Sequence, residues 1–351
     1  MVVDYTPEPG GDWEISSPNA EGLDSTLVEV LYSEATYLQT LYGLLVIRNG
    51  RLIAEKYFNG ASRDQLSGRQ SVTKSYTSAC VGLALEQGYL SSVDQKMMDF
   101  FPEFADSIAD PRKNDITIKH LLQMRGGYPW EENEPPYFDR LFPEGVWPIT
   151  ALPHIVGFPL TADPGTKFKY SNLTSHIIAA IVTRACSMDL DTFAQRHLFD
   201  PMDAELGKWG RDTKGYCLGM TEIYVTARDM GKFGQMYMDD GMFRGTRVMP
   251  VDWVGASKQR YSEGINVSGY PWQSRVGDFA DIGYGYQWWS ARAGDHRFDY
   301  AWGHGGNLIV LLEEFDMVIV TTADPLHYDP NSWKHEGAII NTVARFIKSL
   351  P

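Results

Sequence analysis

A serine and a lysine one helical turn apart are the residues of this chain whose types and spacing best suit chemistry. Ser71 and Lys74 stand in segment 68–80, where a polar loop leads into apolar residues that recur at three- and four-residue steps. This spacing predicts a helix that begins at Ser71, ends near Gly88 and carries both side chains on one face. Burial and the positive end of the helix dipole would keep the lysine neutral, so that it could accept the serine proton and activate the hydroxyl.

A second segment carries a tyrosine and an asparagine that such a nucleophile could use. Tyr170 ends a short extended piece and Ser171 is predicted to cap the next helix, so the phenol would lie outside regular structure. A phenol beside a lysine ammonium has a lowered pKa and can act as a general base. Asn172 can hydrogen-bond a substrate carbonyl or hold the lysine. Taken alone, this triplet also fits a half-buried tyrosine beside a capping serine.

The third segment is the run His304-Gly305-Gly306-Asn307, which stands directly before an apolar strand. Adjacent glycines at the start of a strand let the backbone approach a ligand closely. The N–H groups of this run could stabilise an oxyanion together with the N–H of Ser71. The competing interpretation is a glycine-rich turn with a surface histidine.

Weaker candidates surround these motifs, and for each of them ordinary packing is the competing interpretation. They lie in the long loop 128–147 and further along the chain: Tyr128, Trp130, Tyr137, Met220 and His335. The three cysteines lack CxxC spacing and are expected to be buried free thiols. No cluster of histidine, cysteine or acidic residues has metal-ligand spacing, so no metal or other cofactor is expected.

The segments that must position these residues are predicted to be both helices and strands. A helix from about 25 to 39 follows the capping residue Asp24, and a hairpin with an Asn49-Gly50 turn, typical of type I′, comes next. Four apolar residues of the helix are expected to face the core: Leu27, Val30, Leu31 and Leu38. The last third of the chain shows four β-rich runs and a closing helix: 282–290, 296–302, 307–313, 317–322 and 331–350.

Strands at both ends of the chain and helices between them predict an α/β (α+β) fold. We expect an antiparallel sheet from the N- and C-terminal segments, flanked by helices, with an inserted mostly helical region. The expected domains are an α/β domain of residues 1–75 and about 215–351, and a mostly helical domain of about 76–214. The active site is expected at their interface.

Composition excludes several functional classes. The net charge is −14 without a block of like charge, which disfavours a nucleic-acid partner. No apolar run approaches the roughly 18 residues that a membrane span needs, and no signal peptide is visible, so a soluble cytoplasmic or periplasmic protein is expected. Aromatic residues make up 13% of the chain, which suggests an aromatic-lined cleft. The oligomeric state stays open.

Together, the three motifs stand in an order that resembles the serine β-lactamase and penicillin-binding protein superfamily. These motifs are Ser71-x-x-Lys74, Tyr170-x-Asn172 and His304-Gly305-Gly306. The Tyr-x-Asn form is similar to that of class C β-lactamases, family VIII carboxylesterases and 6-aminohexanoate-dimer hydrolases. Three further segments support the resemblance, which covers nearly the whole chain: 121–128, 164–172 and 226–234.

The resemblance implies a β-lactamase/transpeptidase-like fold and a serine hydrolase that acts on a small-molecule ester or amide through an acyl-enzyme on Ser71. Lys74 and Tyr170 would share proton transfer, and the oxyanion would be held by the Ser71 N–H and one N–H of the Gly306-Asn307 stretch. His304 stands where related β-lactamases carry a lysine that binds the substrate carboxylate, which favours an esterase or amidase. The alternatives are a β-lactamase or D-amino-acid peptidase, and a penicillin-recognising binding module without turnover.

Overall fold

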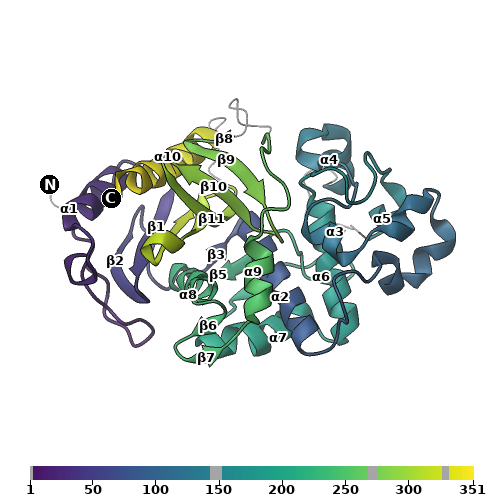
Figure 1. Cartoon of the computed structure of the whole chain (residues 1–351), viewed down its shortest axis with the longest axis horizontal. Coiled ribbons are helices and arrows are strands. Elements are labelled where there is room, and N and C mark those ends of the chain that lie inside the picture. Colours follow the sequence, from purple (N-terminus) through teal and green to yellow (C-terminus); the bar gives the residue numbers. More distant parts are fainter. Residues whose placement is uncertain (1–2, 143–151, 268–274, 326–331) are drawn as a thin grey trace.

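Strands from the two ends of the chain form one antiparallel sheet in the order β2-β1-β13-β12-β11-β10-β9-β8 (Figure 1). This confirms the predicted sheet. The strands are β1 Leu41–Arg48, β2 Arg51–Tyr57, β8 Arg275–Val276, β9 Phe279–Tyr284, β10 Trp289–Ala293, β11 His296–Gly303, β12 Asn307–Leu312 and β13 Met317–Ala323. The computed structural model describes residues 3–142, 152–267, 275–325 and 332–351.

Helices cover both faces of this sheet. Helix α8 packs against β1, β12 and β13, whereas α1 and α10 pack together on the other face (Figure 1). The helices are α1 Ser25–Ala35, α2 Thr73–Glu86, α3 Ile118–Leu122, α4 Pro135–Leu141, α5 His154–Gly157, α6 Asn172–Cys186, α7 Leu190–Ala194, α8 Ala227–Met238, α9 Val251–Lys258 and α10 Ser332–Ser349. Helices α3 to α6 lie to one side of the sheet, which agrees with a mostly helical insertion.

Small sheets connect the helical region to the strands. One joins β3 Ser67–Gly68, β5 Ile223–Val225 and β4 Lys208–Trp209, in that spatial order. The other pairs β6 Met242–Phe243 with β7 Thr246–Arg247. The first of them ties the segment just before Ser71 to the segment just before α8. The domain boundaries proposed from the sequence stay a prediction.

The alternation of side chains along β1 explains why both faces of the sheet are covered. Leu45 and Ile47 belong to the core that includes α8, whereas Leu44 and Val46 belong to the core of α1 and α10. Successive strand residues point to opposite faces of the sheet. A continuous apolar run therefore needs a covering layer on each face. The hairpin turn that joins β1 to β2 has Asn49 at φ 51° and Gly50 at φ 72°, which confirms the type I′ turn.

Two local predictions are corrected by the packing. Val30 is 54% exposed, because the buried stripe of α1 is formed by Val28, Leu31, Tyr32 and Ala35. The single run expected at 282–290 is two strands, β9 and β10, joined by a turn. At that turn Gly285 lies against α9, and a Cβ added there would be 2.0 Å from the carbonyl oxygen of Ser257.

The turn that carries Ser71 is held between α2 and the sheet. A 3₁₀ turn spans Gln70–Val72, and α2 begins at Thr73, so Ser71 precedes the α-helix rather than starting it. Strand β11 approaches this turn so closely that a Cβ on Gly303 would lie 2.3 Å from Arg69 O and 3.2 Å from Val72 N. Only glycine allows this backbone contact.

We therefore expect Gly303→Ala to push β11 away from the Ser71 turn. Overpacking of this kind lowers the free energy of unfolding by about 1–3 kcal/mol. Urea denaturation would measure the loss. Gly255→Ala is the matched control, because a Cβ there meets no atom within 4 Å. The control should be neutral or more stable by up to about 1 kcal/mol, since alanine favours a helix over glycine. Equal stability of the two variants would contradict the close approach.

Candidate active site

Ser71 and Lys74 lie side by side at a cavity, as the helical spacing predicts. Lys74 Nζ is 2.8 Å from Ser71 Oγ. Ser71 lines the cavity and is half-buried, whereas Lys74 is only 1% exposed. The residue before the serine, Gln70, has φ 48°, an uncommon conformation for a residue other than glycine. Its carbonyl accepts a 2.6 Å hydrogen bond from Thr73 Oγ1, which helps to hold this tight turn.

The buried amine of Lys74 is surrounded by acceptors and one aromatic ring. Its Nζ donates to Asn172 Oδ1 at 2.9 Å and to Met220 O at 3.2 Å, and it lies 4.6 Å from the centre of the Tyr170 ring. Burial lowers the pKa of Lys74 to about 7, although the charges of Glu132 and Glu131 act in the opposite direction. A substantial share of Lys74 is therefore neutral near pH 7 and can accept a proton.

Tyr170 is a neutral phenol, which corrects the expectation of a lowered pKa. Burial raises its pKa well above 10, and Glu132 raises it further, while a hydrogen bond with Ser71 acts against them. The side chain is 6% exposed. The lysine that was expected to lower the pKa is itself partly neutral near pH 7, and burial outweighs any effect of its charge on the pKa of Tyr170. Near pH 7 the phenol of Tyr170 can therefore donate or relay a proton, whereas the neutral share of Lys74 can accept one.

The start of α6 is organised by a buried carboxylate that sequence reasoning missed. Glu131 is 0% exposed and accepts from Ser171 Oγ at 2.7 Å, Asn172 N at 3.0 Å and Leu173 N at 3.2 Å. Burial raises its pKa to about 7, against these hydrogen bonds. Ser171 Oγ in turn accepts from Thr174 N, which confirms the predicted cap. The only signal in the sequence was an acidic pair within an aromatic loop.

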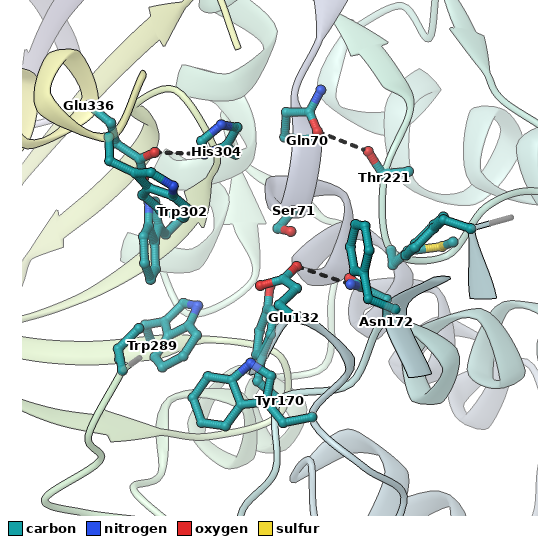
Figure 2. Close-up of a pocket in the computed structure, with 16 residues that line it drawn as sticks. Gln70, Ser71, Glu132, Tyr170, Asn172, Thr221, Trp289, Trp302, His304 and Glu336 are labelled. Carbon is teal, nitrogen blue, oxygen red and sulfur yellow. Dashed lines mark hydrogen bonds and ion pairs between the residues drawn. The ribbon is translucent and has the colours of Figure 1, made fainter. Parts of the chain in front are cut away.

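The second acid of that pair faces the cavity. Glu132 is exposed, lines the cavity and accepts from Asn172 Nδ2 at 3.0 Å (Figure 2). Asn172 therefore bridges Lys74 and Glu132 through the two ends of its amide. Because the Glu132 carboxylate accepts from Nδ2, the amide oxygen of Asn172 is the end that meets Lys74. Glu132 also places a negative charge on the cavity wall.

The glycine run 304–306 is the turn between β11 and β12. Gly305 and Gly306 have φ 89° and 94°, and a Cβ on Gly306 would lie 2.9 Å from the Ile339 side chain. Two of the N–H groups in this turn are engaged. Gly305 N donates to Glu336 Oε2 at 3.0 Å, and Gly306 N donates to Gly303 O at 3.2 Å.

The oxyanion donor expected from the Gly306-Asn307 stretch is therefore corrected. Asn307 is 0% exposed and pairs with Gly303 in the sheet, while its side chain bonds His304 O and Ala323 N. Its role is to close the turn. Ser71 and His304 flank the close contact between Gly303 and the Ser71 turn. Their N–H groups are therefore the candidate pair of oxyanion donors.

His304 reaches the cavity with a buried carboxylate behind it. Its Nδ1 is 2.8 Å from Glu336 Oε2, and the carboxylate also accepts from Trp302 Nε1 at 2.5 Å (Figure 2). The His304 side chain is 34% exposed, whereas that of Glu336 is 0% exposed. Glu336 lies in the first turns of α10, next to the predicted candidate His335, and nothing in its local sequence marked it as a partner of the distant motif.

The cavity that these residues share has a volume of about 490 Å³ and a mainly aromatic wall. The rings belong to Trp130, Phe138, Phe142, Tyr170, Trp289, Trp302 and Trp333. Met220 also lines the cavity, as expected. Three of the weaker candidates do not. Tyr128 is buried and donates to Ile155 O at 3.0 Å, Tyr137 packs against Phe158, and half-buried His335 is not part of the described wall.

The described part of the chain has neither a candidate metal site nor a candidate membrane span. No group of three or more histidine, cysteine or acidic residues there could hold a metal ion. None of the described helices has both the length and the apolar character required to cross a bilayer. Cys80, Cys186 and Cys217 are buried free thiols, as expected.

Comparisons with known proteins agree with this architecture. The family model described as Beta-lactamase matches residues 40–324. The 6-aminohexanoate-dimer hydrolase of Paenarthrobacter ureafaciens is 25% identical over 327 residues, which cover 87% of this chain and 78% of that protein. Solved structures share this fold, among them the following two. The hydrolase EstCE1, with promiscuous acyltransferase activity, has a TM-score of 0.70 at 15% identity and covers 93% of this chain and 100% of its own. The D-amino acid amidase from Ochrobactrum anthropi SV3 has a TM-score of 0.67 at 15% identity, with 92% and 100% covered.

The pKa of Lys74 predicts how the reactivity of Ser71 depends on pH. Labelling by a fluorophosphonate should accelerate about tenfold per pH unit below the pKa of Lys74 and stop accelerating above about pH 7, because only neutral Lys74 accepts the proton. Glu131 ionises over the same range, which restores the hydrogen bonds at the start of α6. Labelling rates between pH 5.5 and 8.5 would test this, and a pH-independent rate would contradict it.

Lys113 provides a matched control for that measurement. It is also 1% exposed, and its Nζ donates to Val156 O and Phe158 O rather than to a residue of the cavity. Lys74→Met should slow the labelling of Ser71 on the order of 10²–10⁴-fold. Lys113→Met removes a buried amine without touching the nucleophile, so the folded variant should keep the wild-type labelling rate.

Proposed function

Since this chain belongs to the β-lactamase family, we propose that it is a serine hydrolase that cleaves ester or amide bonds of small molecules through an acyl-enzyme on Ser71. The observation that carries the proposal is the 2.8 Å contact between Ser71 Oγ at the cavity and Lys74 Nζ, whose pKa is about 7. A buried neutral amine beside a hydroxyl is the arrangement that activates a serine. The name of the Paenarthrobacter relative, a 6-aminohexanoate-dimer hydrolase, supports an amide-cleaving or ester-cleaving reaction.

Acylation begins when neutral Lys74 takes the proton of Ser71 as Oγ attacks the substrate carbonyl carbon. The carbonyl oxygen becomes an oxyanion and accepts hydrogen bonds from the N–H groups of Ser71 and His304. Collapse of the tetrahedral intermediate breaks the bond to the leaving alcohol or amine. That group takes the proton from the Lys74 ammonium, directly or through the phenol of Tyr170.

Deacylation repeats these steps with water as the nucleophile. Water gives a proton to Lys74 and attacks the acyl carbon. Collapse of the second tetrahedral intermediate breaks the bond between this carbon and Ser71 Oγ, and Oγ takes the proton from the Lys74 ammonium. The products are a carboxylic acid and the alcohol or amine. Asn172 supports both halves of the cycle, because its amide oxygen holds Lys74 Nζ at 2.9 Å.

The charges of the cavity favour substrates without a carboxylate near the reacting bond. Glu132 places a negative charge on the wall, and the imidazole of His304 is already paired with Glu336. An anionic substrate would therefore meet a like charge and a cation that is already neutralised. The aromatic wall suits acyl chains and rings. This supports an esterase or amidase over the alternatives of a β-lactamase or a D-amino-acid peptidase.

Hydrolysis of p-nitrophenyl butyrate, a linear amide and a cephalosporin by one preparation would test the proposal. We expect the neutral ester to be cleaved fastest and the anionic cephalosporin slowest. Ser71→Ala and Lys74→Ala should each lower kcat at least about 10³-fold, because the loss of either member of a catalytic unit removes most of the effect of the whole unit. Full activity of Ser71→Ala would refute the acyl-enzyme.

The remaining alternative is a module that is acylated without turnover. It predicts release of one equivalent of p-nitrophenol per protein and no steady-state rate. A burst followed by continued release that Ser71→Ala abolishes would instead establish turnover.

A further inference from the structure

A single buried carboxylate holds one wall of the cavity together. Glu336, on α10, accepts from Trp302 Nε1 at 2.5 Å and from Gly305 N at 3.0 Å, and it lies 2.8 Å from His304 Nδ1. All three partners belong to the end of β11 and the turn after it. The carboxylate is 0% exposed. Removing the carboxylate would leave the buried N–H groups of Trp302 and Gly305 without their acceptor and His304 without its ion-pair partner.

This contact decides which nitrogen of His304 carries a proton. His304 Nδ1 and Glu336 Oε2 form an ion pair, in which the carboxylate oxygen lies off the direction of the Nδ1–H bond. At 2.8 Å from a carboxylate, which only accepts hydrogen bonds, Nδ1 must hold its proton in both charge states of the ring. Nε2 is therefore the atom that gains or loses a proton. It donates a hydrogen bond when the ring is charged and accepts one when the ring is neutral.

We infer that Glu336 is a positioning residue. It orients the β11–β12 turn for the oxyanion and keeps the His304 imidazolium in place. His304 Nε2 then donates a hydrogen bond to a bound substrate opposite Ser71. The inference rests on the proposed function. It explains why an acid of α10, far from the three sequence motifs, lies fully buried behind the third of them. Trp302, His304 and Glu336 all belong to the wall of the cavity. Because the Glu336 side chain is 0% exposed, the carboxylate shapes this wall through the residues that it holds.

Within the part of the chain that the structure describes, few other charges lie near enough to control His304. Burial lowers its pKa, but the contact with Glu336 raises it more, and the charge of Glu132 across the cavity adds to the increase. The carboxylate of Asp324, beside the turn, is hydrogen-bonded to Tyr42. The Trp333 ring, 4.7 Å from the imidazole, carries no charge. His335 stands next to Glu336 on α10. The net result is a pKa of His304 above its ordinary value.

The arrangement predicts a bell-shaped pH dependence of kcat/KM for a neutral ester. Activity should rise through about pH 7 as Lys74 becomes neutral, and it should fall at higher pH as His304 loses the Nε2 proton. Tyr170 does not produce the descending limb, because its pKa lies well above 10. In Glu336→Gln, the pKa of His304 should fall because the neighbouring carboxylate is lost. The descending limb should then move to lower pH, so that the ratio of kcat/KM at pH 8.5 to kcat/KM at pH 6.5 decreases.

The chain contains a matched control for this variant. His296 lies on β11, the strand that ends next to His304, and its Nδ1 is 2.8 Å from Glu314 Oε2. Neither His296 nor Glu314 lines the cavity. Glu314→Gln should therefore leave both limbs in place, as should His335→Gln. His304→Gln should abolish the descending limb. A Glu336→Gln profile that is lower at every pH but has unmoved limbs would show a purely structural role and overturn the inference.

The tautomer of His304 tests the same inference without activity. Proton–nitrogen correlation spectra of the wild-type imidazoles, with the His304 signal assigned by its loss in His304→Gln, should show the Nδ1–H form at high pH. The Nε2–H form would overturn the inference even if Glu336→Gln fails to fold. If the wild-type protein hydrolyses no ester or amide, the proposed function fails, whereas the Nδ1–H tautomer would still support the contact with Glu336.

Discussion

Burial of the Lys74 amine is the constraint on which the rest of this site depends. An ammonium that has lost its water is disfavoured, so the amine is partly neutral near pH 7 and can serve as a base. It must still satisfy its hydrogen-bonding capacity, and Ser71, Asn172 and the Met220 carbonyl do this from three different segments. Ser71, the start of α6 and the segment before β5 thus meet at one nitrogen atom.

Three carboxylates act on this centre at different depths. Glu131 is buried and holds the first residues of α6, which places Tyr170 and Asn172. Glu132 reaches the cavity and sets its charge. Glu336 is buried behind the opposite wall and holds Trp302 and the His304 turn. Two of the three influence the reaction through the residues that they orient, and the negative charge of the third disfavours anionic substrates.

The sheet places the opposite wall by close packing of backbone. Gly303 brings the end of β11 into contact with the turn around Ser71, and no larger residue fits there. The core strands β12 and β13 are buried along their whole length, which makes this end of the sheet a rigid support. A rigid support matters because oxyanion donors contribute most when they are already in place before the charge develops.

The sequence by itself determined the local elements and the order of the motifs. The Asn49-Gly50 turn, the Ser171 cap and the Ser71–Lys74 pair depend on residues near one another in the chain, so local rules predict them. The antiparallel sheet followed from strand-like runs at both ends of the chain. Burial and long-range partners do not follow from local pattern. Only the tertiary structure decided that Tyr170 stays a neutral phenol, that Tyr128 faces Ile155, and that Asn307 closes a turn. It also brought Glu131 and Glu336 to the site, because a single acidic residue in a loop or helix carries no sign of a partner 30 or more positions away.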